Sequence, residues 1–364
     1  MKYAALQDVC EINMGQSPDS SSYNGEGRGI PFFQGNADFG ERNPVTRVWC
    51  DAPSKIANAN DILISVRAPI GAVNYATETC CIGRGLAAIT PDLNRVSSEY
   101  VFWLLKGKNA ELNSKGTGST FKAINRKALE EIRVPDVSLE EQAAQAANLE
   151  VAYKIIQMRK QQLSTLDELI KARFVEMFGD PELNPMEWPV EALGDVLSVE
   201  PQNGLYKPQS DYVQDGTGIP ILRIDAFYDG KVNDFSRLKR LNCTDTERSR
   251  YLLMENDIVI NRVNSLEYLG KCAWITGLIE PTVFESNMMR FHVDESRIDP
   301  CYMTRLLCST FIYKQILNRA KKAVNQASIN QGDVQSFKIL VPPIKLQKQF
   351  AAFVAQIDKS KYSA

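Results

Sequence analysis

The chain has 364 residues, of which 44% are hydrophobic and 24% charged, a composition typical of a folded protein with two or three domains. No stretch reaches the roughly 18 consecutive apolar residues of a membrane span, and the first residues lack a basic segment followed by an apolar core. We therefore expect a cytoplasmic protein that does not enter a membrane. The formal net charge of −2 argues against DNA binding by bulk positive charge, so a DNA-binding face has to be local or completed by a partner.

The cysteine and histidine content argues against a metal site. The eight cysteines never form a Cys-x-x-Cys, and the single histidine has no cysteine at a zinc-like spacing. The adjacent pair Cys80 and Cys81 is typical of small side chains in a strand core within a reducing compartment. We predict no metal.

A series of short motifs occurs twice in the same order along the chain. The matched segments are residues 6–9 with 193–196, 29–33 with 218–222, 60–64 with 256–260, 100–105 with 302–307, 124–125 with 329–330, 134–135 with 341–342, and 139–142 with 346–349. The offset grows from 187 (Leu6 to Leu193) to 207 (Pro135 to Pro342), which indicates insertions inside the second copy. Chance recurrence of common strand-boundary tripeptides is the alternative, and the shared order favours a duplication.

Each copy has the pattern of a mixed α/β (α+β) domain. Residues 29–33 and 60–64, with their counterparts, predict turns that lead into buried strands. Residues 100–105 and 302–307 have apolar positions at helical spacing. We place the two similar globular domains at residues 1–137 and 188–343.

A long helix is predicted between the copies, over residues 138–180. Ser138 followed by Glu141 is a capping box, the next forty residues contain no Gly or Pro, and Gly179-Asp180-Pro181 ends the helix. At about 1.5 Å per residue, such a helix spans roughly 60 Å and could hold two domains apart.

Apolar residues recur along this helix at a spacing of seven, which is typical of a helix that packs against another helix. They are Leu149, Ile156, Leu163 and Ile170. Alternatively, the helix packs across one domain as part of its core, although the polar residues Lys160 and Asp167 interrupt the apolar seam. A shorter helix is predicted in residues 344–364, with Phe350 and Ile357 on one apolar face. It could lie antiparallel against the central helix and form a coiled coil.

The motifs of common enzymes are missing. The sequence has no phosphate-binding Gly-x-x-x-x-Gly-Lys-Ser/Thr and no Asn/Asp-Pro-Pro-Tyr/Phe motif of an adenine methyltransferase. His292 lies in an alternating, strand-like stretch, where a satisfied structural histidine is a better interpretation than a catalytic one. We predict no catalytic residue and no cofactor.

Both copies concentrate basic and amide side chains just upstream of the predicted helix that follows each domain. Residues 115–127 hold four cations and no acid, and residues 314–331 also hold four cations without an acid. Such side chains hold phosphates and read base edges. A solvated charged loop is the alternative for either segment. The candidate DNA-binding residues are Lys115, Ser119, Thr120, Lys122 and Arg126 in the first copy and Lys314, Arg319, Lys321, Asn325 and Gln326 in the second.

This layout resembles the specificity subunits of type I restriction-modification systems. The resemblance covers nearly the whole chain and rests on residues 9–18, 32–35, 61–71, 118–135, 139–142 and 171–181. It implies two target-recognition domains that each read one half of a bipartite duplex DNA site. The two helical regions would set the spacing of the halves and dock methyltransferase subunits, which carry S-adenosylmethionine, and a motor-nuclease subunit could join for cleavage. Recognition domains vary greatly in sequence, so no base-contacting residue is transferred.

The resemblance also implies a protein without chemistry of its own, because the partner subunits would carry methylation and cleavage. The chain departs from the pattern in its final helix, which is much shorter than the central one. Two other functions stay open at this point. One is a two-headed scaffold that joins proteins without binding DNA, and the other is an enzyme with an unrecognised site.

Overall fold

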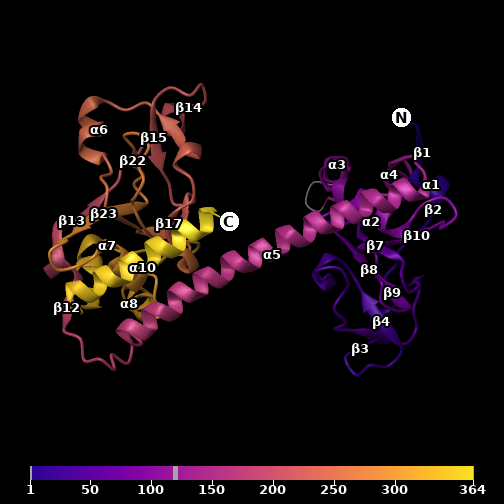
Figure 1. Ribbon diagram of the computed structural model, residues 1–364, viewed down its shortest axis with the longest axis horizontal. Helices are drawn as coiled ribbons and strands as arrows, with labels where there is room; N and C mark the ends of the chain where they lie inside the picture. Colours follow the sequence, from indigo (N-terminus) through magenta and orange to yellow (C-terminus); the bar gives the residue numbers. More distant parts are fainter. Residues whose placement is uncertain (1, 118–121, 364) are drawn as a thin grey trace. The chain divides into compact units, whose positions relative to one another are not determined.

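The computed structural model describes residues 2–117 and 122–363. It divides into two compact units, Met1–Lys160 and Gln161–Ala364. The helix α5 (Leu139–Phe178) belongs to both, with its first half in one unit and its second half in the other (Figure 1). Its bounds match the predicted helix closely. No helix among the described residues is long and apolar enough to cross a membrane.

The first unit has two main sheets and a small strand pair. The antiparallel sheet has the order β2 (Cys10–Met14), β10 (Leu86–Pro91), β7 (Ile62–Ser65), β8 (Val73–Tyr75). The mixed sheet has the order β3 (Tyr23–Asn24), β5 (Trp49–Cys50), β4 (Ile30–Phe33), β9 (Cys80–Ile82), β6 (Ile56–Ala57). The pair is β1 (Tyr3–Ala5) with β11 (Arg133–Pro135). The helices are α1 (Leu6–Val9), α2 (Ser98–Gly107), α3 (Asn109–Lys115) and α4 (Arg126–Glu130).

The second unit repeats this plan and adds to it. Its larger sheet has the order β13 (Leu197–Asn203), β23 (Met288–Val293), β19 (Ile258–Asn261), β21 (Cys272–Trp274), β17 (Gly230–Val232), β16 (Phe227–Tyr228). The mixed sheet has the order β14 (Tyr212–Val213), β18 (Lys239–Leu241), β15 (Ile219–Leu222), β22 (Val283–Phe284). A third sheet has the order β20 (Val263–Asn264), β25 (Ala327–Ser328), β24 (Lys321–Lys322), and the strand pair is β12 (Val190–Ala192) with β26 (Lys338–Leu340). The helices are α6 (Asp245–Tyr251), α7 (Pro300–Leu307), α8 (Thr310–Arg319), α9 (Gln331–Gln335) and α10 (Ile344–Ser363).

The strand orders and registers show that the two units share one framework, which confirms the predicted duplication. The order β2-β10-β7-β8 corresponds to β13-β23-β19-β21. Each mixed sheet contains one parallel pair at the same place, β4 with β9 and β15 with β22. The hairpin of β16 and β17 extends the second sheet beyond β21 and lies within the segment where the offset between the copies grows.

The repeated Asn-Asp-Ile motif forms the same turn in both units. Asn60 and Asn256 have left-handed backbone angles, with φ of 72° and 70°. Asn tolerates this conformation better than most residues do, because its short side chain can bond locally. The carboxylates that follow, on Asp61 and Asp257, accept hydrogen bonds from backbone N–H groups three residues upstream, at 2.7 and 2.8 Å.

A buried glutamine joins each domain to the helix that follows it. The Gln142 amide donates to the carbonyl oxygens of Arg95 (3.1 Å) and Val137 (3.0 Å) and accepts from the backbone N–H of Ser97 (2.8 Å). Gln347 makes the corresponding three bonds in the second unit, at 3.1, 2.7 and 2.8 Å. These two side chains are 1% and 0% exposed, so each satisfies backbone groups that water does not reach.

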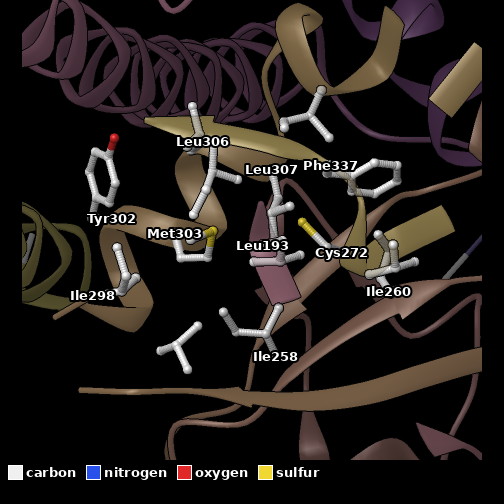
Figure 2. Close-up of a cluster of buried hydrophobic side chains, with 14 of the residues drawn as sticks. Leu193, Ile258, Ile260, Cys272, Ile298, Tyr302, Met303, Leu306, Leu307 and Phe337 are labelled. Carbon is white, nitrogen blue, oxygen red and sulfur yellow. The ribbon is translucent and has the colours of Figure 1, made fainter. Parts of the chain in front are cut away.

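The core of the second unit includes the second half of α5. Ile170, Phe174 and Phe178 pack into a cluster with side chains of α7, β19 and β23, part of which Figure 2 shows. Phe174 also lies 5.5 Å from Phe350 of α10, measured between ring centroids, and Lys361 pairs with Asp167 at 2.5 Å. The contact that lies earlier in α5, at Asp167, is made by the residue that lies later in α10, Lys361. The two helices are therefore antiparallel, which confirms the predicted packing of the final helix on the central one.

The cysteine pair behaves as the sequence indicates. Cys80 and Cys81 lie in β9 and are fully buried. Burial raises the pKa of the Cys80 thiol to about 12, which keeps it protonated. Among the described residues, no group of three or more His, Cys, Asp or Glu side chains is arranged to hold a metal ion.

Candidate nucleic-acid interface

The basic segment of the first unit pairs with the chain just after strand β7. Ala123 forms bridges with both Arg67 and Thr117, and the backbone N–H of Ala68 donates to the carbonyl oxygen of Lys122 at 3.1 Å. The next residue, Ile124, donates to the carbonyl oxygen of Val66 at 2.9 Å. Two predicted residues of this segment, Ser119 and Thr120, lie outside the described residues.

The second unit has a β-hairpin at the equivalent place. Strands β24 and β25 form this hairpin, residues 321–328, and β25 pairs with β20. Ile329 then donates to the carbonyl oxygen of Arg262 at 3.0 Å, just as Ile124 does to Val66. The two framework copies therefore present their basic segments at corresponding positions.

The predicted residues of the first unit fall into two groups. Lys115 pairs with Glu111 (2.9 Å) within α3, and Arg126 pairs with Glu130 (2.7 Å) within α4. Both pairs join residues one helical turn apart and leave the cations accessible. Lys122 is exposed, and its ammonium group makes no ion pair with the described residues.

The predicted residues of the second unit divide into side chains that bond to other residues of the unit and side chains that do not. Lys314 on α8 forms an ion pair with Glu182 at 2.6 Å. Arg319 donates to Ser336 Oγ at 2.9 Å and lies over the ring of Phe337, so it fastens α8 to the segment after α9. By contrast, Lys321, Asn325 and Gln326 are exposed on the hairpin, and their side chains make no hydrogen bond or ion pair within the described part of the chain. The hairpin residues are therefore available to a ligand.

A hollow beside the basic segment of the first unit was not predicted. It has a volume of about 210 Å³ and is lined by Ser17, Gln34, Gly35, Asn36, Arg67, Ala68, Arg84 and Gly85. The lining comes from segments that are distant in the sequence, and it combines two guanidinium groups with two amides. Gly85 is needed at this place, because a Cβ atom there would lie 2.2 Å from the carbonyl oxygen of Gln34. Residue composition alone gives little signal for such a site.

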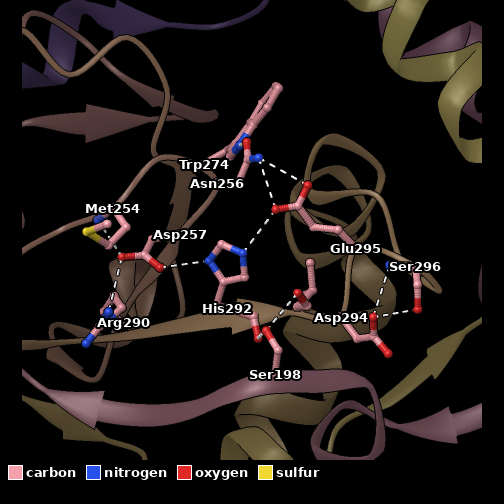
Figure 3. A network of polar contacts seen from close by, with 11 residues as sticks. Ser198, Met254, Asn256, Asp257, Trp274, Arg290, His292, Asp294, Glu295 and Ser296 are labelled. Carbon is pink, nitrogen blue, oxygen red and sulfur yellow. Dashed lines mark hydrogen bonds and ion pairs between the residues drawn. The ribbon is translucent and has the colours of Figure 1, made fainter.

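The single histidine is part of a structural polar network, shown in Figure 3. The His292 ring lies 3.0 Å from Asp257 Oδ1 through Nδ1 and 3.1 Å from Glu295 Oε1 through Nε2. The nearby hydroxyl of Ser198 donates to the backbone carbonyl oxygens of residues 292 and 293 and not to the imidazole. Both ring nitrogens therefore lie within hydrogen-bond distance of a carboxylate, which supports the interpretation as a satisfied structural histidine.

The residues predicted to face a partner helix differ in burial along α5. Ile170 is buried where α5 meets α10, and Phe350 is buried on the α10 side of the same contact. Leu163 and Ile357 are half-buried. Leu149 and Ile156 are 47% and 52% exposed.

Comparison with known proteins identifies the class to which this framework belongs. The framework is repeated, and each copy has a basic segment at the same place. The family described as the type I restriction modification DNA specificity domain matches residues 1–168 and, a second time, residues 185–363. The two matches cover nearly the whole chain, which therefore belongs to this family. The resemblance inferred from the sequence is confirmed.

Relatives of known name agree with this assignment. The chain is similar to the type I restriction enzyme MjaIX specificity subunit of Methanocaldococcus jannaschii, with 26% identity across 96% of this chain and 84% of the relative. A stretch of 161 residues is 43% identical to an MjaX specificity subunit of the same organism, but it covers only 44% of this chain and 38% of that relative. The crystal structure of the type I restriction-modification S subunit from M. genitalium has the same fold, with a TM-score of 0.60 and 15% identity across 100% of this chain and 90% of the other.

Proposed function

We propose that this chain is the specificity subunit of a type I restriction-modification complex and that each of its domains reads one half of a bipartite duplex DNA site. The observation that carries the proposal is the duplicated framework, which presents exposed cations beside the same strand end in both copies. Phosphate contacts by cations position a protein on DNA, and amide or guanidinium groups distinguish bases in the major groove.

The proposed division of labour follows the predicted segments. Residues 1–137 and 188–343 act as target-recognition domains, and residues 138–180 and 344–364 are the helical regions that dock methyltransferase subunits. Those partners carry S-adenosylmethionine and the methylation chemistry in the cytoplasm, and a motor-nuclease subunit can join them for cleavage. Because the chain's net charge is −2, we expect the partners to supply much of the phosphate contact.

Genome-wide adenine methylation tests this function directly. A host that expresses the chain with its neighbouring methyltransferase should show a new split motif that is absent with the methyltransferase alone. Exchange of residues 1–137 for the equivalent domain of another family member should then change one half of the motif and keep the other. Unchanged methylation, with the two proteins shown to be associated, would reject the proposal, and a change in both halves would reject the modular assignment.

The hairpin makes a second prediction, about salt dependence. In the complex with methyltransferase, Lys321→Ala should weaken binding to the cognate duplex and lower the slope of log affinity against log salt by about one, because one phosphate contact is lost. Lys338→Ala is the matched control, since it removes an exposed cation of the same unit that lies on β26, outside the hairpin. Equal slopes for the two variants would remove the hairpin from the interface.

A further inference from the structure

The hollow of the first unit holds polar side chains that the fold itself does not use. Gln34, Arg67 and Arg84 are exposed, and Asn36 is half-buried. Among the described residues, none of these four side chains takes part in a hydrogen bond or an ion pair. These four residues therefore line a space of about 210 Å³ with side chains that have no partner in the described part of the chain.

The backbone that carries these side chains is fixed on several sides. The N–H of Gln34 donates to Asp38 Oδ2 at 2.7 Å, and the N–H of Gly83 donates to the carbonyl oxygen of Phe33 at 2.8 Å. Gly85, in turn, accepts from the N–H of Val66 at 2.9 Å. A fixed backbone limits where the ends of these side chains can reach, so the ordering that remains on binding is that of the side chains alone.

The second unit has the same backbone frame with different side chains. Leu222 accepts from the N–H of Glu285 at 3.0 Å, as Phe33 does from Gly83, so Arg223 occupies the place of Gln34. There the guanidinium group is held by the Tyr212 hydroxyl at 2.9 Å and by Glu285 at 3.4 Å. The position therefore differs in chemistry between two otherwise corresponding domains, as expected for a residue that gives each domain its own half-site.

We propose that this hollow is the base-reading site of the first domain, in which Gln34 identifies an adenine and Arg67 and Arg84 anchor the flanking backbone. The inference rests on the proposed function and adds the residue that sets one position of the first half-site. The primary amide of glutamine offers one donor and one acceptor that match the N7 acceptor and N6 donor on the major-groove edge of adenine. The guanidinium groups match phosphate oxygens.

The test replaces Gln34 in the full chain, assembled with its methyltransferase. Gln34→Ala should relax one position of one half-site, with a loss of discrimination of roughly 10- to 100-fold between adenine and the other bases at that position, as for a lost bidentate contact. Gln34→Glu should disfavour adenine there, because the carboxylate lacks the donor. The other half-site should stay unchanged. Gln7→Ala, which removes an exposed amide on α1, is the matched control and should leave the motif intact.

The possible results separate this inference from the proposed function. If the wild-type complex produces no split motif, the proposed function fails. If the wild type produces one and both Gln34 variants keep it with wild-type discrimination, only the present inference fails. A uniform loss of affinity across all sequences would show that Gln34 contacts the DNA backbone, which also overturns its base-reading role. Because the Gln34 side chain bonds to nothing else among the described residues, we expect both variants to unfold at the wild-type temperature.

Discussion

The substitution Gln347→Ala should destabilise the second unit by about 3 kcal/mol, because it leaves three buried backbone groups without a partner. The lost bonds are those to the carbonyl oxygens of Arg297 and Pro342 and to the N–H of Asp299. The side chain is 0% exposed, so water cannot replace it without local rearrangement. Hydrogen exchange measured by mass spectrometry should show faster exchange in peptides of α7 and α10.

The duplication supplies internal controls for this result. Gln142→Ala should produce the same effect in the first unit, since its three bonds are the same in kind. Gln356→Ala removes an exposed amide from α10 and should change stability by less than about 0.5 kcal/mol. If Gln347→Ala lowered the free energy of unfolding no more than Gln356→Ala does, the hydrogen bonds of Gln347 would not be what joins the domain to the following helix.

A comparably large loss is expected for Phe350→Ala, about 3–5 kcal/mol, because it opens a cavity in a tightly packed core. The Phe350 ring is fully buried and lies 5.5 Å from Phe174 and 5.6 Å from Phe178, with both rings edge to face. Tyr302 of α7 stacks against Phe174 in the same cluster, at 5.6 Å. The loss is measured as the free energy of unfolding in urea, with hydrogen exchange in peptides of each unit as the probe.

The change should be confined to the second unit, because every neighbour named above belongs to it. Leu169→Ala is the matched control, since this apolar residue lies on the same half of α5 and is exposed. It should cost less than about 0.5 kcal/mol. A similar cost for both variants would mean that α10 is not held by its aromatic contacts.

The sequence by itself determined the features that depend on local patterns. The helix α5 was predicted over residues 138–180 and is observed from Leu139 to Phe178, because its capping box and its Gly-Asp-Pro end are signals within a few residues. The duplication was also visible in the sequence. Turns such as Asn60-Asp61 depend on short-range backbone preferences, so the same residues occur at the corresponding turn of each copy. The family resemblance followed from the same motifs.

Only the tertiary structure decided which polar residues are free to bind. Lys314 and Lys321 lie seven positions apart in one basic segment, yet the first meets Glu182, far away in sequence, and the second projects from a hairpin. The hollow around Gln34 depends on strands β4 and β9 pairing in parallel with a particular register, which brings segments some fifty residues apart into contact. Composition and periodicity describe what each segment can form, whereas strand register and packing between distant segments fix which side chains keep unsatisfied donors and acceptors.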